Sequence, residues 1–233
     1  MKPQFHGREH LNLEVLSSKL QTKDKETLIS LENRSYTSIL SPGFPNISTT
    51  AAFEFENIER NEFFENVIKD GLEKFKQVYG YDSKHFNPPG GREHPLVHKY
   101  LSERGIKYLD TQFLKKEHLG GGKYAKKLNW TGKRNKYNQY YQVRNVVFEP
   151  THEKGVDWIN YSLKQIDAAF FWNRPAIISS HRVNFCGHVS QKNRKQGLKT
   201  LSELLQAIVK KWPDVEFISS VDLCSLMKSH KKF

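Results

Sequence analysis

Two histidines near the start of the chain are the residues best suited to metal chemistry. His6 and His10 lie in the segment His-Gly-Arg-Glu-His. Imidazole nitrogens are common zinc ligands, and two histidines at this spacing can converge on one ion where the backbone bends between them. The order differs from the His-Glu-x-x-His of metalloprotease helices, because Glu9 directly precedes the second histidine. Taken alone, the spacing also fits two surface histidines.

Two further segments place polar residues after short apolar runs. Residues 85–91 read His-Phe-Asn-Pro-Pro-Gly-Gly, in which proline fixes φ and glycine permits close backbone approach to a ligand. Residues 177–182 read Ile-Ile-Ser-Ser-His-Arg, which predicts a buried strand that delivers His181 to a rim. Each segment also has a simpler interpretation, a tight turn for the first and a capping histidine for the second.

Alternating helices and strands must position these segments. Apolar residues at helical spacing predict helices, and short apolar or β-branched runs predict strands. The helices are expected over residues 13–20, 58–78, 95–104, 155–172, 193–212 and 221–228. Asn12 is expected to cap the first helix, which runs through Leu13, Leu16 and Leu20, and Gly80 is expected to stop the second. The strands are expected over residues 1–10, with a break at Gly7, and over residues 84–87, 106–110, 139–148, 176–181 and 216–220. Such alternation indicates a parallel sheet with helices against it.

The predicted strand ends select a small set of polar residues. In an α/β barrel, functional side chains gather at the carboxyl ends of the strands. The residues at or just beyond such ends are His6, Asn87, Asp110, Glu149 and His181.

Taken in order, the three segments resemble the NodB-type polysaccharide deacetylase family. The family's His-x-x-x-His motif, which supplies two metal ligands, matches His6 and His10. Its Arg-x-Pro-Pro motif matches residues 86–90, although Asn87 stands where an arginine is usual. Its Leu-x-His strand end, whose histidine is the general acid, matches residues 178–181 with a one-residue difference in spacing. The resemblance runs from about residue 1 to residue 223.

The resemblance implies a fold and an activity. The expected fold is a distorted seven-stranded (β/α) barrel of the deacetylase type, incomplete at its N-terminus. The expected activity is removal of acetyl groups from a glycan by metal-activated water, with zinc held by His6 and His10. His181 would be catalytic, and Arg144 would orient a base or bind a sugar oxygen, although a structural ion pair fits Arg144 equally. The expected substrate-binding residues are Asn87, Pro88, Pro89, Gly90, Arg92 and Arg182.

One motif of the family has no counterpart in this chain. The family begins with an Asp-Asp pair, of which one member is a metal ligand and the other the general base, and no acidic residue precedes His6. The chain is therefore expected to be a fragment, a catalytically inactive glycan-binding relative, or an enzyme in which another acid substitutes. The acids available for substitution are Glu9, Glu54, Glu56, Asp110 and Glu149.

The charge of the chain adds a third functional class. The net charge is +12, and residues 115–136 hold eight Lys or Arg but only one acid, Glu117. A basic loop over residues 115–138 could hold a polyanion, so a nucleic-acid-binding protein is the remaining alternative, although the same loop could be merely solvated. Trp130, within this loop, could stack on a sugar ring.

Length and composition limit the remaining possibilities. The 233 residues fit a single barrel domain over residues 1–233, with a polar excursion over residues 23–50. No apolar run is long enough to span a bilayer and no secretory signal is visible, so a cytoplasmic location is expected. Cys186 and Cys224 are too few for a disulfide scaffold and are expected to be ordinary thiols.

Overall fold

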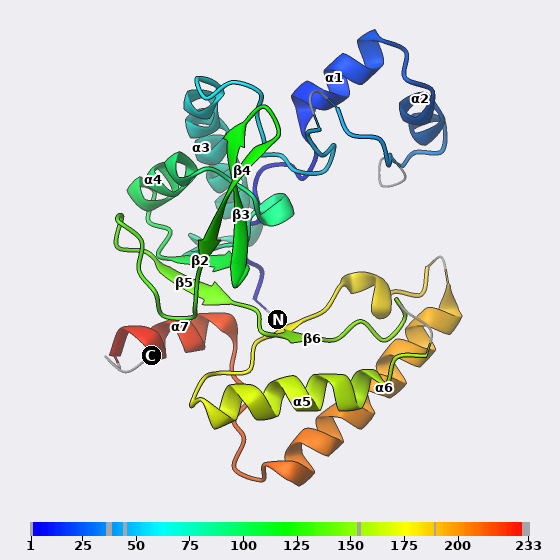
Figure 1. Cartoon of the computed structure of the whole chain (residues 1–233), viewed down its shortest axis with the longest axis vertical. Coiled ribbons are helices and arrows are strands. Elements are labelled where there is room, and N and C mark those ends of the chain that lie inside the picture. The colour runs from blue at the N-terminus through cyan, green and yellow to red at the C-terminus, as the bar shows by residue number, and fades with distance from the viewer. Residues whose placement is uncertain (1, 36–38, 44–45, 153–154, 189, 230–233) are drawn as a thin grey trace. The chain divides into compact units, whose positions relative to one another are not determined.

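The chain folds into two compact units in a computed structural model, residues Met1–Gln142 and Val143–Phe233 (Figure 1). The structure describes residues 2–35, 39–43, 46–152, 155–188 and 190–229. The predicted polar excursion therefore includes residues 36–38 and 44–45, which lie outside the described part. The prediction of a single domain stays a prediction.

A small three-stranded sheet lies mainly in the first unit. Its strands are β1 (His85–Phe86), β2 (Tyr108–Thr111) and β5 (Tyr140–Val143), in the order β1-β2-β5. Strand β1 pairs in parallel with β2, and Phe5 pairs in parallel with Phe86 on the other side. The predicted strand over residues 1–10 is thus reduced to a single bridge.

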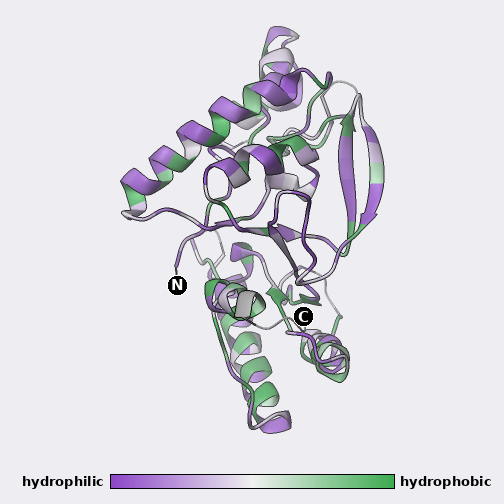
Figure 2. Cartoon of the chain, turned by 90° about the vertical axis from the view of Figure 1, so that its left-hand side faces the viewer, coloured by the Kyte–Doolittle hydropathy of each residue, from purple (hydrophilic) through white to green (hydrophobic). Residues whose placement is uncertain are grey.

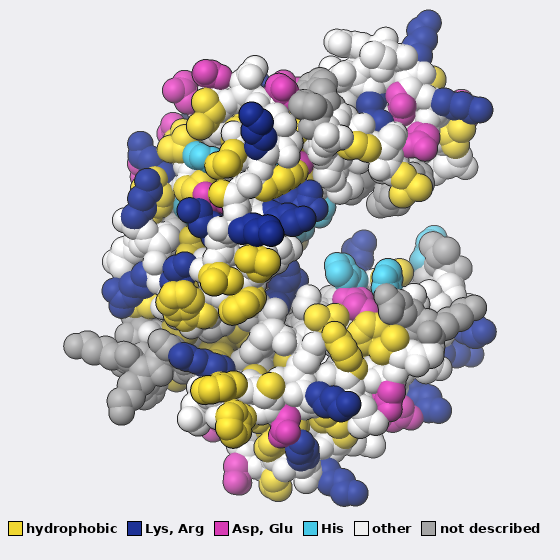
Figure 3. Space-filling view, in the orientation of Figure 1, with side chains coloured by type: hydrophobic (Ala, Val, Ile, Leu, Met, Phe, Trp, Pro, Cys, Tyr) yellow, Lys and Arg dark blue, Asp and Glu magenta, His cyan; other side chains and the backbone are white. Residues whose placement is uncertain are grey.

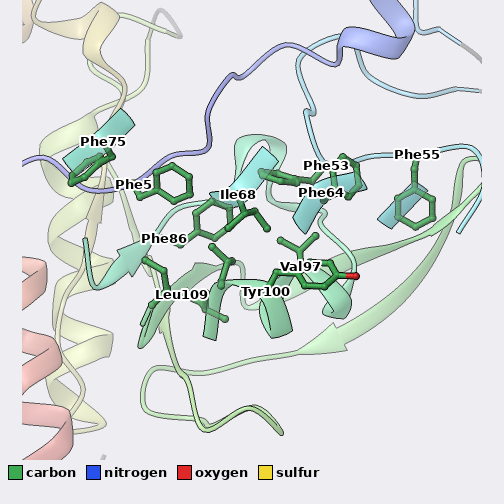
Figure 4. Close-up of a cluster of buried hydrophobic side chains, with 12 residues drawn as sticks. Phe5, Phe53, Phe55, Phe64, Ile68, Phe75, Phe86, Val97, Tyr100 and Leu109 are labelled. Atoms are coloured by element: carbon green, nitrogen blue, oxygen red, sulfur yellow. The ribbon is translucent and has the colours of Figure 1, made fainter. Parts of the chain in front are cut away.

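Two helices cover this sheet and bury a shared aromatic core. Helices α3 (Arg60–Tyr79) and α4 (Pro95–Glu103) pack against each other. Helix α3 ends at Gly80, whose φ of 75° is left-handed, as the sequence predicts. Figure 4 shows that the core side chains come from the helices, the strands and the segment around Phe53. Figure 2 shows the matching alternation of hydrophilic and hydrophobic residues along the helices.

Two short helices precede this core. Helix α1 (Leu13–Gln21) begins at Asn12, whose side chain accepts a hydrogen bond from the Val15 amide, as a cap should. The predicted helix is therefore confirmed, although Leu13 and Leu20 are exposed and its buried residues are Val15 and Lys19. Helix α2 (Lys25–Glu32) lies within the predicted excursion and begins at Asp24, which is also a capping residue.

The predicted basic loop is a β-hairpin. Strands β3 (Leu114–Gly120) and β4 (Lys123–Leu128) pair antiparallel around Gly121 and Gly122, whose φ angles of 55° and 70° suit a two-residue turn. Figure 2 draws both strands mainly in the colour of hydrophilic residues. The prediction of a loop was wrong for residues 115–128, because the glycine turn was not recognised as a hairpin signal.

The second unit is a smaller α/β arrangement. Strands β6 (Val146–Val147) and β7 (Ile178–Ser179) pair in parallel. Helices α5 (Trp158–Phe171) and α6 (Gln191–Lys211) pack on each other, and α5 also contacts β6. Their buried core comprises Val146, Phe148, Ile166, Leu204 and Ile208.

Two predictions for the second unit need correction. Residues 216–220 form no strand before helix α7 (Ser220–Ser229), and Phe217 and Ile218 are exposed. The apolar run before His181 is not a buried strand either, because Ile178 is 37% exposed and Ser179 is half-buried. An apolar sequence predicted burial here, but strand β7 is only two residues long.

The molecule is therefore a mixed α/β protein with small sheets. The described residues form three separate sheets and do not show a closed barrel. No helix in the described part of the chain is long and apolar enough to cross a bilayer.

Candidate functional site

Strand pairing brings the two candidate motifs of the first unit together. Phe5 pairs with Phe86, and the Asn87 amide donates to the Phe5 carbonyl at 3.0 Å. His6 consequently lies beside Asn87, and its Nδ1 donates a hydrogen bond to the Asn87 carbonyl oxygen at 2.5 Å. The chain then turns at Gly7, with a φ of 91°, and the His10 ring comes to lie 5.1 Å from the His6 ring, centroid to centroid.

The two imidazoles satisfy part of what a metal site requires. Because Nδ1 of His6 donates to a carbonyl, the lone pair of the neutral ring is on Nε2, the arrangement that metal-binding histidines use. Nδ1 of His10 is buried without a hydrogen bond among the described residues. Yet in the described part of the chain no three His, Cys, Asp or Glu side chains gather closely enough to hold a metal. His6 and His10 therefore fit two positions of a ligand set.

The Asn-Pro-Pro-Gly turn packs closely on its surroundings. Pro88 and Pro89 are buried, and a β-carbon at Gly7 would lie 3.3 Å from Pro89 Cγ. Gly90 has a φ of 74°, and a β-carbon there would lie 2.9 Å from Ala51 Cβ. Both glycines are thus required by close approach as well as by backbone conformation, and they fix the turn beside His6.

Arg92, a predicted substrate-binding residue, is held by a buried acid. Its Nη1 lies 3.3 Å from Oε1 of Glu54, which is 2% exposed, and its guanidinium lies 5.6 Å from the centre of the Tyr124 ring. Tyr124 also donates to Glu54. A substrate role for Arg92 stays a prediction, but Glu54 is already engaged and far less suited to replace a missing metal ligand.

Two of the other candidate acids of the first unit contact basic side chains, whereas Oε2 of the remaining one, Glu56, is buried with no hydrogen-bond partner among the described residues. Glu9 pairs with Arg8 at 2.5 Å, and Arg8 also reaches Asp70 at 3.2 Å. Asp110 lies 3.3 Å from Nε2 of the buried His85. None of these acids joins His6 and His10 in a group of three among the described residues.

In the second unit, the pairing of β6 with β7 brings His181 next to Glu149. Val147 pairs with Ser179, so the residues two positions further along, Glu149 and His181, emerge side by side. His181 Nδ1 donates to Glu149 Oε1 at 2.7 Å, and the His181 amide donates to the same oxygen at 3.1 Å. The His181 side chain is 78% exposed, whereas that of Glu149 is 12% exposed. The carboxylate therefore holds a solvent-facing imidazole whose other nitrogen is available for proton transfer.

Sequence reasoning missed the residues that support this pair. The buried Asn184 donates from Nδ2 to Glu149 Oε2 at 2.6 Å, and its Oδ1 accepts from Thr151 Oγ1 at 2.8 Å. Helix α6 approaches so closely at Gly197 that a β-carbon there would lie 1.8 Å from the Asn184 carbonyl oxygen. The available signal was a glycine inside a strongly helical pattern, which often marks close packing.

The remaining predicted site residues lie at the surface of the second unit. Arg144 is exposed, and no ion pair to it occurs among the described residues, so the structural ion pair that its position suggested is not seen. Arg182 is exposed and begins the 3-10 turn Arg182–Asn184 that follows His181. Their predicted roles toward substrate stay predictions.

A buried charged network in the first unit had no sequence signal. Glu93, His98 and Lys115 are each 2% exposed, and Glu93 Oε1 accepts from His98 Nε2 at 2.7 Å and from the Lys115 ammonium. Burial would raise the pKa of Glu93, but the Lys115 charge and the His98 hydrogen bond lower it to about 2. Burial lowers the pKa of His98, which is therefore neutral at pH 7. The network is enclosed and anchors β3 to the segment before α4.

Comparison with known proteins adds little to this geometry. No family model matches the chain, and no curated protein matches it. Its structure resembles the crystal structure of a proposed polysaccharide deacetylase from Mycobacterium smegmatis, with 14% identity and a TM-score of 0.46, over 72% of this chain and 57% of that one. The chain thus spans little more than half the length of that protein. So remote a likeness leaves the activity to be argued from the residues themselves.

Proposed function

We propose that the chain is a metal-dependent deacetylase that acts on an N- or O-acetylated glycan. The observation that carries the proposal is the contact of His6 with the Asn87 carbonyl and with the His10 ring. It unites two motifs 81 residues apart that the deacetylase resemblance requires together. In-order parallel pairing of Phe5, β1 and β2 is the arrangement expected of a (β/α) barrel, which we propose as the finer fold.

The residues of the chain have separate roles in this proposal. His6, through Nε2, and His10 would hold the metal, with zinc the ion that best suits imidazole ligands. When bound, such an ion supplies Lewis-acid polarisation of the acetyl carbonyl. In the second unit, His181 is proposed as a general acid that acts from Nε2 when the ring carries both protons, since its Nδ1–H is held by Glu149. Arg144, Arg182, Arg92 and residues 87–90 are proposed to contact the glycan.

The test is acetate release from an N-acetylated chitooligosaccharide by the full chain supplied with zinc. His181→Ala is expected to lower the rate about 10²–10⁴-fold, the usual contribution of a general acid. His188→Ala removes another exposed histidine of the same unit and should leave the rate unchanged. Turnover that is unaffected by His181→Ala would refute the assigned role.

A second candidate is a glycan-binding relative without catalytic activity. It is favoured by the lack, among the described residues, of a third metal ligand beside His6 and His10. This candidate predicts binding of the chitooligosaccharide with no acetate release, even with zinc present. Any turnover that disappears in His181→Ala would exclude it.

A further inference from the structure

We infer that the β3–β4 hairpin and Trp130 form a binding surface for an anionic polysaccharide. The surface, called here the basic platform, comprises Leu114, Lys116, Lys126, Leu128 and Trp130. That the polymer is a glycan rests on the proposed function. That the polymer is anionic rests on the exposed, directly opposed lysines of the hairpin, Lys116 and Lys126.

The lysines of the basic platform are arranged unfavourably in the absence of a ligand. Lys116 stands directly opposite Lys126 in the antiparallel register, and both side chains are exposed. Like charges at directly opposed positions repel each other. Among the described residues, no acid forms an ion pair with Lys116 or Lys126. An anionic group bound between the two strands would relieve this repulsion.

Exposed apolar side chains lie next to these charges. Leu114 and Leu128 face each other at the base of the hairpin and are 47% and 56% exposed. Trp130 is 50% exposed, with the Lys133 ammonium 4.8 Å from its ring centre. Figure 3 shows hydrophobic and basic side chains side by side over the hairpin. A sugar ring offers an apolar face to an indole, while its carboxylate or sulfate would meet a lysine.

The hairpin is fixed to the rest of the first unit before any ligand arrives. The Gly121 amide donates to the Glu56 carbonyl at 2.9 Å, and the His118 amide donates to the Arg92 carbonyl at 2.9 Å. Lys115, next to Lys116, is buried on Glu93. A surface held in this way loses little conformational entropy on binding. Since Lys116 and Lys126 take no part in these anchors, replacing them should not unfold the hairpin.

The rows of the basic platform suit a sugar that carries a charge and also has an apolar face. The Lys116–Lys126 pair is two residues from the Leu114–Leu128 pair, and a strand rises about 3.4 Å per residue, so one charged row lies ~7 Å from one apolar row. An acidic or sulfated sugar can place its charge on the first row and an apolar ring face on the second.

The test is calorimetric titration of the full chain with polygalacturonate, without zinc. Lys116→Gln/Lys126→Gln is expected to weaken binding about tenfold and to reduce its salt dependence. The control Lys192→Gln/Lys195→Gln removes two exposed lysines from α6 and should change affinity less than about twofold. Trp130→Ala should also weaken binding, whereas Trp172→Ala, at a residue 71% exposed, should not.

Three results would overturn the inference. They are no binding of polygalacturonate by the wild-type chain, equal weakening in the two double variants, and tighter binding of a single-stranded oligonucleotide of equal charge. Failure of the deacetylase proposal would give a different set of results. In that case acetate release would be absent while polygalacturonate binding kept its dependence on Lys116 and Lys126.

Discussion

At the scale of single residues, the register of parallel strands decides which side chains meet. Pairing of Phe5 with Phe86 sets His6 against Asn87, and pairing of Val147 with Ser179 sets His181 against Glu149. In both units the contact forms just beyond the last paired residue. Polar groups there can combine a rigid backbone with access to solvent, which is what proton transfer or metal binding requires.

Glu149 should prove essential to the conformation of its surroundings. Its two oxygens accept from the His181 amide, His181 Nδ1 and Asn184 Nδ2. In Glu149→Gln these three donors meet a group with only one acceptor oxygen, so we expect a loss of about 1–3 kcal/mol in the free energy of unfolding. The control Glu216→Gln, at an exposed acid, should cost less than about 0.5 kcal/mol. Urea denaturation of both variants measures these losses. Equal denaturation midpoints would contradict the stabilising role assigned to the Glu149 carboxylate.

Lys115 and Lys116 are neighbours with opposite expected effects on stability. Lys115→Met leaves Glu93 buried beside a neutral side chain, which should cost about 3–5 kcal/mol. Lys116→Met alters an exposed side chain and should change stability by less than about 0.5 kcal/mol. Adding Glu93→Gln to Lys115→Met should recover part of the loss, because no unpaired charge then remains. Thermal unfolding of the three variants is the measurement. An unchanged melting temperature in Lys115→Met would refute the ion pair between Lys115 and Glu93.

At the scale of elements, the sequence predicted those with strong local signals. Helix α3 follows from its apolar periodicity and the stop at Gly80, and α1 from the cap at Asn12. The hairpin was missed because its lysines obscured the glycine turn, and α2 because a short polar helix has little periodicity. The predicted last strand was wrong because β-propensity alone cannot form a strand without a partner.

The Asn-Pro-Pro-Gly turn offers a test of close packing with a matched control. Gly90 and Gly80 have nearly equal φ angles of 74° and 75°, so an alanine at either suffers the same backbone strain, about 1 kcal/mol. Only at Gly90 would the added carbon meet another residue, Ala51 Cβ at 2.9 Å, whereas nothing lies within 4 Å at Gly80. Gly90→Ala should therefore lower the melting temperature distinctly more than Gly80→Ala. Equal shifts would mean that the turn is not packed in this way.

At the scale of the whole molecule, titration of the buried network should make stability depend on pH. The pKa of His98 is lowered in the folded state, so unfolding takes up a proton and stability falls as pH drops below about 6.5. The pKa of Glu93 is lowered from 4.5 to about 2, so its contribution, roughly 3 kcal/mol, is present above pH 4.5 and is lost as pH falls toward 2.

Urea denaturation between pH 7 and pH 3 would test this dependence. We expect the free energy of unfolding to fall in two stages, gently below pH 6.5 and steeply below pH 4.5. Acidification also increases the net charge above +12, which acts in the same direction through self-repulsion. Measurement in high salt removes that second contribution. A stability maximum near pH 4 would contradict the ionisation states assigned to Glu93 and His98.

The candidate site as a whole was only partly predictable. His6, Asn87 and His181 could be selected because each lies at or just beyond the end of a predicted strand. The partnership of Glu149 with His181 and the support from Asn184 could not, because they depend on the pairing of β6 with β7 and on a helix that approaches at Gly197.

The central claim is that His6 and His10 bind a divalent metal, and isothermal titration of the full chain with zinc tests it most directly. One ion should bind per chain, and binding should be lost in both His6→Ala and His10→Ala but kept in His188→Ala, at an exposed histidine of the second unit. Unchanged zinc binding in His6→Ala, or no binding by the wild-type chain, would contradict the claim.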